Sequence, residues 1–165
     1  MTYKLVRKPA FIVTGKSLLT TQEENKYAGT ISAFWAKCNQ DGTSEELLRL
    51  MKSHQIGDAL LGVCYGLQSD GTFEYLVGAE VTAEPQEPGL TTLEIPASEW
   101  MIFESIGPLP AAIQDVWQKI FAQVLPASGY QHAGTPDMEV YYDGDTRAAD
   151  YRCEVWIPVR MTGNK

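Results

Sequence analysis

The chain repeats one order of elements twice, and this duplication constrains its fold more than any single motif does. The first half reads as strands near 3–6 and 10–15, a helix near 22–38, a shorter amphipathic stretch at 44–54, and strands near 59–67 and 73–81. The second half reads as strands near 90–95 and 99–105, a helix near 109–125, and strands near 138–142 and 151–159. We therefore expect one domain over residues 1–165, built from repeats at 1–83 and 90–160 with a Pro- and Glu-rich linker at 84–89.

The helix of each half shows an apolar stripe at helical spacing. In the second half the stripe consists of Ile113, Val116, Trp117, Ile120, Phe121 and Val124. Trp35 and Trp117 occupy matching helix positions, and we expect both to pack in the core. Neither half alone could bury its sheet and its helix stripe well. We therefore predict an α+β fold with pseudo-two-fold symmetry, antiparallel sheets, two main helices and a central cleft, which is a usual place for a small-molecule site.

The last predicted strand combines a carboxylate with an aromatic side chain. Because strand side chains alternate, Cys153, Val155 and Ile157 share one face, while Arg152, Glu154 and Trp156 share the other. A carboxylate two residues from an indole suits a flat, lipophilic cation. The same pattern also fits a solvent-facing surface with a charge pair. If Arg152 pairs with Glu154, the site is neutral and its preference for cations weakens.

Composition restricts the partners of the chain. Its 21 acidic and 13 basic residues give a formal charge of −8, which repels nucleic acid and attracts cations, so we expect no direct nucleic-acid binding. No apolar run approaches the ~20 residues of a membrane span, and the N-terminus lacks a signal-peptide core. Three scattered cysteines indicate reduced thiols in a cytoplasm. The sequence shows no metal-binding spacing, phosphate loop or nucleophile elbow, so we expect neither a cofactor nor a metal.

Three segments together resemble a known family. They are the run FEYLVGAEV at 73–81, the turn Ile106-Gly107-Pro108 and the closing EVWIPV at 154–159, in the duplicated order described above. The chain resembles the gyrase-inhibitor-like effector-binding domain over nearly its whole length. In multidrug-responsive bacterial transcription regulators this domain is fused to a helix-turn-helix module. The present chain starts at the first strand, so it is similar to the stand-alone versions, including those carried as integron cassettes. It departs from the family pattern in having Ser105 where a histidine is frequent.

The resemblance implies a pocket between the repeats, lined by aromatic side chains, with a glutamate of the last strand inside it. That glutamate corresponds to Glu154, and Trp156 lies one step along the same face. The remaining candidates for ligand contact are Tyr141, Tyr75, Trp100 and Tyr65, of which Tyr65 fits a core position equally well.

The favoured hypothesis is a stand-alone binding protein for lipophilic, cationic small molecules. One alternative is a hydrolase of the same superfamily, in which Glu154 acts as base or nucleophile. Another is a protein-interaction module that inhibits a DNA-working enzyme through its acidic surface. Enzymatic activity therefore stays open, as does association with a protein partner or a second copy of the chain.

Overall fold

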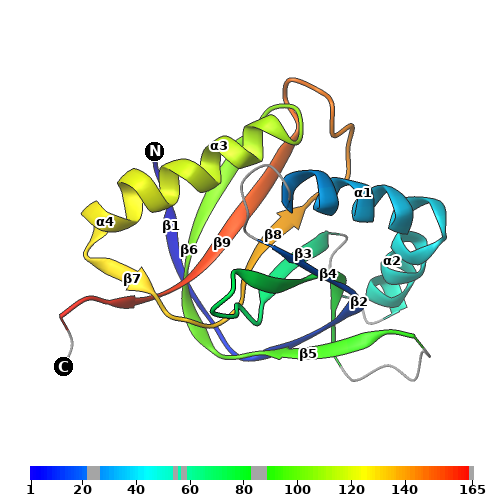
Figure 1. Cartoon of the computed structure of the whole chain (residues 1–165), viewed down its shortest axis with the longest axis horizontal. Helices are drawn as coiled ribbons and strands as arrows, with labels where there is room; N and C mark the ends of the chain where they lie inside the picture. The colour runs from blue at the N-terminus through cyan, green and yellow to red at the C-terminus, as the bar shows by residue number, and fades with distance from the viewer. Residues whose placement is uncertain (22–26, 54–55, 57–58, 83–88, 164–165) are drawn as a thin grey trace.

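The computed structural model describes residues 1–21, 27–53, 56, 59–82 and 89–163 (Figure 1). The elements of the first half are β1 (Lys4–Lys8), β2 (Phe11–Thr21), α1 (Tyr27–Gln40), α2 (Thr43–Ser53), β3 (Leu60–Tyr65) and β4 (Thr72–Val81). Those of the second half are β5 (Thr91–Ile95), β6 (Ser98–Ile106), α3 (Ala111–Lys119), a π-helical turn η1 (Ile120–Val124), α4 (Leu125–Ser128), β7 (Tyr130–His132), β8 (Asp137–Tyr141) and β9 (Arg152–Met161). The predicted α+β class and element order are confirmed. The linker expected at 84–89 lies outside the described residues except for Gly89.

All the described strands belong to one nine-stranded sheet, whose main path has the order β1-β6-β9-β8-β3-β4-β2-β5, while β7 pairs with β9. By their order in each half, β1 corresponds to β5, β2 to β6, β3 to β8 and β4 to β9. When each strand is exchanged for its counterpart, the main path has the same order read from the other end. The expectation of separate sheets is corrected here, because β3 and β8 pair antiparallel at the centre and join the halves. In that pairing Gly62 lies opposite Glu139.

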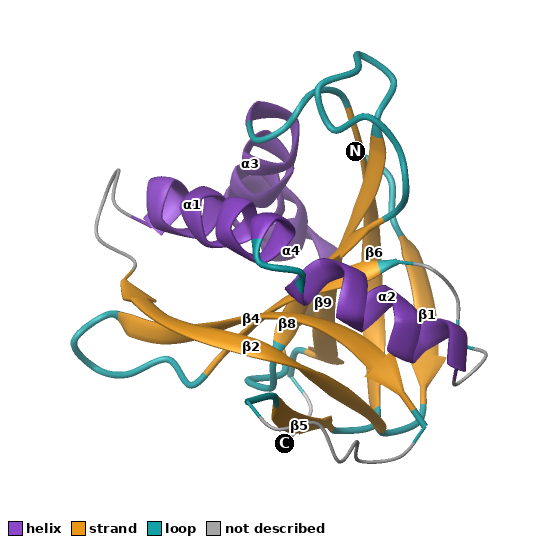
Figure 2. Ribbon diagram, turned by 90° about the vertical axis from the view of Figure 1, so that its right-hand side faces the viewer, coloured by secondary structure: helices purple, strands orange, loops and turns teal. Residues whose placement is uncertain are grey.

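The helices cover one face of the sheet (Figures 1 and 2). On the second half, Ile113, Val116 and Ile120 pack against buried side chains of β6 and β9. On the first half, α1 and α2 pack against the face of β4 that carries Tyr75 and Val77. The two helical layers therefore meet above β3 and β8, where the halves join.

The opposite face of the sheet is strongly concave. The ring centroids of Phe11 on β2 and Trp100 on β6 lie 6.3 Å apart, although four strands separate β2 from β6 in the sheet. In a flat sheet these two strands would be about 24 Å apart. The sheet therefore curls around a second core, to which Leu61, Met138 and Val140 contribute from the central strands.

The second-half helix, expected near 109–125, continues past Pro126 to Ser128. The N–H of Leu125 bonds to the carbonyl of Ile120, so a widened π-helical turn precedes the proline. Such a turn accommodates a residue that lacks an N–H and needs room for its ring. The helix ends at Gly129 in the left-handed conformation, with a φ of 81°. Among the described residues, no helix has both the length and the apolar character needed to cross a lipid bilayer.

Candidate ligand-binding site

Two buried glutamates lie on neighbouring strands and face opposite sides of the sheet. Glu139 on β8 is 8% exposed and Glu154 on β9 is 4% exposed. Glu139 lies opposite Val155 in the pairing of these strands, and Glu154 lies opposite Val140. Because Val155 packs in the helix-side core and Val140 in the concave core, Glu139 belongs to the helix side and Glu154 to the concave side.

The carboxylate of Glu139 accepts three hydrogen bonds, all from neutral groups. The hydroxyls of Tyr75 and Tyr141 each donate to Oε1 across 2.7 Å. The indole N–H of Trp117 donates to Oε2 across 2.8 Å. Trp35 extends the cluster by donating its indole N–H to the Tyr75 hydroxyl across 2.9 Å. The cluster therefore draws on β4, β8, α1 and α3, and it unites both halves of the chain.

A glycine makes room for this cluster. Tyr75 on β4 reaches Glu139 on β8 across the intervening strand β3, which carries Gly62 at the crossing point. A Cβ atom on Gly62 would lie 2.0 Å from the Tyr75 hydroxyl and 3.0 Å from Oε1 of Glu139. The phenol therefore passes through space that any other residue at position 62 would fill.

Burial dominates the electrostatics of the cluster. It raises the pKa of Glu139, and the hydrogen bonds from Tyr75, Tyr141 and Trp117 only partly oppose that rise. Burial, together with the nearby Glu139 charge, also raises the pKa of both tyrosines well above the usual range, so they stay protonated donors. Among the described residues, no Lys, Arg or His forms an ion pair with Glu139. When ionised, this carboxylate is a buried negative charge without a countercharge in that part of the protein.

Aromatic side chains lead from this carboxylate toward the surface. Trp35, Trp117 and Tyr141 are half-buried, and Trp35 meets Tyr141 edge-on with ring centroids 5.1 Å apart. Trp117 stacks on Phe121 at 6.0 Å, and Phe121 is 46% exposed. Both tryptophans pack at the edges of the cores, as expected from their helix stripes. In addition, both direct their indole N–H groups into the cluster.

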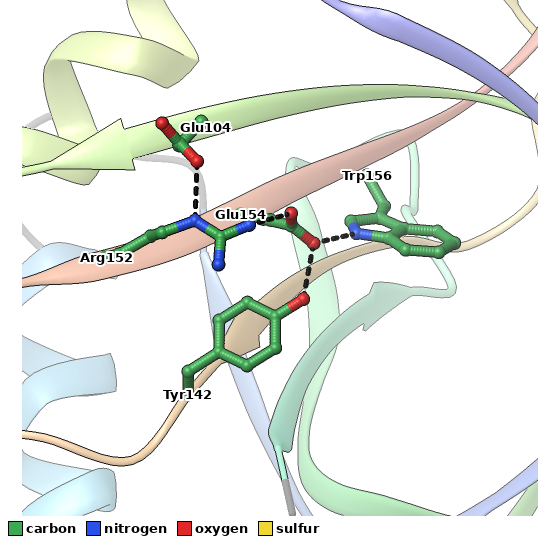
Figure 3. A network of polar contacts seen from close by, with 5 residues as sticks. All are labelled: Glu104, Tyr142, Arg152, Glu154 and Trp156. Atoms are coloured by element: carbon green, nitrogen blue, oxygen red, sulfur yellow. Dashed lines mark hydrogen bonds and ion pairs between the residues drawn. The ribbon is translucent and has the colours of Figure 1, made fainter. Parts of the chain in front are cut away.

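Glu154 has a different set of partners (Figure 3). Its Oε1 accepts hydrogen bonds from the Tyr142 hydroxyl at 2.8 Å and from the Trp156 indole at 3.1 Å. Its Oε2 lies 3.1 Å from Nη2 of Arg152, which also pairs with Glu104. The sequence left open whether Arg152 pairs with Glu154. The structure shows that it does, so the charge of this glutamate is compensated.

The residues expected to line one pocket are divided between the two faces. Tyr75 and Tyr141 meet at Glu139 on the helix side, whereas Glu154 and Trp156 lie on the concave side. Trp100 is fully buried, with its ring 5.7 Å from that of Trp156, and Tyr65 packs half-buried against the concave core. The sheet therefore separates this candidate set into two groups.

Of two hollows in the described part of the protein, one borders the Glu154 group and neither is lined by Glu139. A pocket of about 200 Å³ adjoins Tyr142 and Trp156 on the concave side. A wider hollow of about 490 Å³ is lined by Met1, Thr2, Glu104, Lys119 and Gln123, which offer a ligand no aromatic wall.

Potential metal ligands do not gather in the part of the chain that is described: no group of three or more His, Cys, Asp or Glu side chains could hold an ion there. His132 instead lies 3.0 Å from a carboxylate oxygen of Asp137, and its other ring nitrogen accepts the backbone N–H of Gly134.

Glu139 was not among the residues predicted from the sequence, although the sequence carries a signal for it. In the run Met138-Glu139-Val140-Tyr141 a glutamate alternates with apolar residues and is followed two positions later by a tyrosine. Alternation places Glu139 and Tyr141 on the same face of a strand. This is the same pattern that drew attention to Glu154 and Trp156.

Comparison with known proteins identifies the family. The model of the GyrI-like small molecule binding domain matches residues 1–160. The chain belongs to this family. No curated protein sequence matches it.

Solved structures of GyrI-like fold agree with this assignment. SAV2435, solved in complex with tetraphenylphosphonium, superposes with a TM-score of 0.82 at 24% identity, over 97% of this chain and 94% of that one. An integron cassette protein from the mobile metagenome of Vibrio cholerae gives 0.66 at 23% identity, over 96% and 95%. The C-terminal domain of EcmrR gives 0.62 at 18% identity, over 98% and 100%. At these identities the likeness concerns the fold alone.

Proposed function

We propose that this GyrI-like domain binds a lipophilic organic cation at Glu139, between α1 and α3. The observation that carries the proposal is a buried carboxylate whose three hydrogen bonds all come from neutral groups. A buried charge without a countercharge is costly, and a bound cation removes that cost. The rings of Trp35, Trp117 and Tyr141 supply apolar contact and cation–π attraction.

The compensation of Glu154 favours Glu139 as the charge-recognising residue. Arg152 already lies 3.1 Å from Glu154, so a cationic ligand there would have to compete with a guanidinium. The pocket beside Tyr142 and Trp156 measures about 200 Å³, whereas sites for drug-sized ligands begin near ~300 Å³. The charge argument directs a cation to the helix side, and the size argument keeps a large one out of the concave pocket.

Access to Glu139 involves the aromatic side chains above it. The carboxylate itself is buried, but Trp35, Trp117 and Tyr141 are half-buried. In our proposal a ligand displaces these rings outward and then stacks on them. Tetraphenylphosphonium, the compound in the SAV2435 complex, is a suitable probe because it combines one positive charge with aryl groups.

The hydrogen bonds at Glu139 favour recognition over hydrolysis. Both carboxylate oxygens already accept bonds from protein donors, two at Oε1 and one at Oε2. A general base needs a carboxylate oxygen within reach of the water that it activates. Donors that hold the carboxylate in place instead give a ligand a fixed negative charge.

Calorimetric titration of tetraphenylphosphonium into the parent protein and Glu139→Gln tests the proposal. Triphenylphosphine oxide, which is neutral and carries similar aryl groups, serves as the control ligand. Removing the charge should weaken binding of the cation about 10- to 100-fold, with a much smaller effect on the neutral compound. Equal losses for both ligands, or no loss for the cation, would show that Glu139 does not recognise charge.

A further inference from the structure

The concave face of the sheet carries a pocket that the proposed function does not use. It has a volume of about 200 Å³, and its central walls lie on the side opposite Glu139, while Met51 of α2 borders it from the helix-side core. Its walls include Tyr142, Trp156, Ala59, Leu61, Met138 and Val140. We infer that this pocket is a second ligand site, specific for a small neutral aromatic molecule of one or two fused rings.

The size of the pocket sets the size of its ligand. An apolar cavity of about 150 Å³ holds a benzene molecule. At about 200 Å³ this pocket is somewhat larger than that, and it lies below the ~300 Å³ at which sites for drug-sized molecules begin. A single ring or a fused pair of rings fits within it, whereas the four aryl groups of tetraphenylphosphonium together exceed its volume.

The charges around the pocket compensate one another, and this selects a neutral ligand. Lys8 and Glu80 both border it, and their side chains form an ion pair at 3.3 Å. Glu154 accepts hydrogen bonds from the two aromatic wall residues, Tyr142 and Trp156, and is paired with Arg152. An ionic ligand would have to break one of these pairs, whereas a neutral aromatic molecule leaves both intact.

The Glu154 network fixes the two aromatic walls (Figure 3). One carboxylate oxygen, Oε1, accepts both the Tyr142 hydroxyl and the Trp156 indole N–H. The guanidinium of Arg152 lies 5.1 Å from the centroid of the Tyr142 ring, which holds that ring from its other side. Glu154 is therefore a positioning residue of the second site, since it orients two ring faces without lining the pocket itself. Rings that are held in place lose little entropy when a flat ligand packs against them.

The two sites share strand β8 but not a side chain. Side chains along β8 alternate between the two faces. Met138 and Val140 pack in the concave core, whereas Glu139 and Tyr141 belong to the helix-side cluster. We therefore expect occupancy of one site to leave the side chains that line the other in place. The inference stands or falls separately from the role proposed for Glu139.

The four tryptophans of the chain give a direct test. Each carries one indole N–H, so a spectrum of ¹⁵N-labelled protein contains a signal for each, assignable with single Trp→Phe variants. Trp156 reports on the concave pocket, while Trp35 and Trp117 report on the Glu139 cluster. Unlabelled indole, a neutral pair of fused rings, is titrated to millimolar concentration with and without saturating tetraphenylphosphonium. Indole should shift the Trp156 signal in both titrations and leave Trp35 and Trp117 in place.

A variant that fills the pocket provides the matched control. Ala59 is a small lining residue, and Ala59→Phe should weaken indole binding at least about tenfold while tetraphenylphosphonium still binds. The same spectra show whether the Ala59→Phe protein is folded. The titration of the parent protein in the presence of the cation tests the inference without this variant. Indole shifts confined to Trp35 and Trp117, competition between the two ligands, or no shift of Trp156 would overturn the inference.

Discussion

The hydroxyl of Tyr75 lies 2.7 Å from Oε1 of Glu139, a residue 64 positions further along the chain. This bond links the hairpin of the first half to the hairpin of the second, across the strand that carries Gly62. It lies where the two halves of the sheet meet. Trp35 from one helix and Trp117 from the other donate hydrogen bonds into it.

The stability of the protein should depend on the space above Gly62 as much as on the hydrogen bond between Tyr75 and Glu139. In Gly62→Ala the new Cβ would meet the Tyr75 hydroxyl at 2.0 Å and the adjoining ring carbon at 2.6 Å. Tyr75 would have to move away from Glu139, which should lower the free energy of unfolding by about 1–3 kcal/mol. Urea unfolding of the two proteins measures the difference.

Shortening Tyr75 provides the control for that substitution. In a Tyr75→Leu background neither the hydroxyl nor the ring is present, so Gly62→Ala should cost less than half as much as it does in the parent. An equal cost in both backgrounds would mean that the clash with Tyr75 is not what position 62 avoids.

Glu139 should make the protein less stable as pH rises. Burial raises the pKa of Glu139 in the folded state. In the unfolded state the pKa of a glutamate is about 4.3. At pH values between these two pKa values, the folded protein therefore binds more protons than the unfolded protein. Stability from this group is therefore complete below about pH 4.3 and is lost as pH increases through the folded pKa. Relative to Glu139→Gln, the parent should lose up to about 1.4 kcal/mol per pH unit within that window.

Chemical denaturation of both proteins at a series of pH values gives this difference directly. Subtracting the two curves cancels the other titrating groups, because the substitution is nearly isosteric. A difference that stays flat, or that grows in favour of the parent as pH rises, would contradict a raised pKa at Glu139.

Arg152 and Glu154 should behave as a coupled pair. Arg152→Met leaves the buried Glu154 carboxylate without its cation, whereas Glu154→Gln leaves Arg152 with Glu104 as its remaining carboxylate partner. Because the Arg152 side chain is half-exposed, each change should cost only about 1 kcal/mol. The double variant should lose less than the sum of the two, as a thermodynamic cycle of melts would show. Strict additivity would mean that the pair contributes nothing to stability.

The sequence carried enough information for the order of elements and for part of the site. The stripe around Ile113 and Val116 and the alternation around Cys153 and Val155 depend only on local periodicity, and the structure places all four residues as expected. Tyr75 and Tyr141 were both chosen as ligand-binding residues, and the structure brings them together at one hydrogen-bond acceptor, Glu139. Their contact with a ligand stays a prediction.

The remaining features depend on strand pairing, which local patterns do not specify. Only the contact of β3 with β8 places Gly62 beside Glu139 and joins two expected sheets into one. The side of the sheet on which each residue lies separates Trp156 from Tyr141, although both are aromatic residues on strands near a glutamate. Whether Arg152 reached Glu154 likewise depended on side-chain conformation.

Binding of tetraphenylphosphonium to Glu139→Gln and Glu154→Gln, compared side by side, tests the central claim most directly. The two substitutions are chemically identical, and both remove a buried carboxylate charge from neighbouring strands. Our account predicts that Glu139→Gln weakens binding of the cation at least about tenfold, while Glu154→Gln changes the affinity for the cation by less than about threefold. The opposite ranking would place cation recognition at Glu154 and contradict the account.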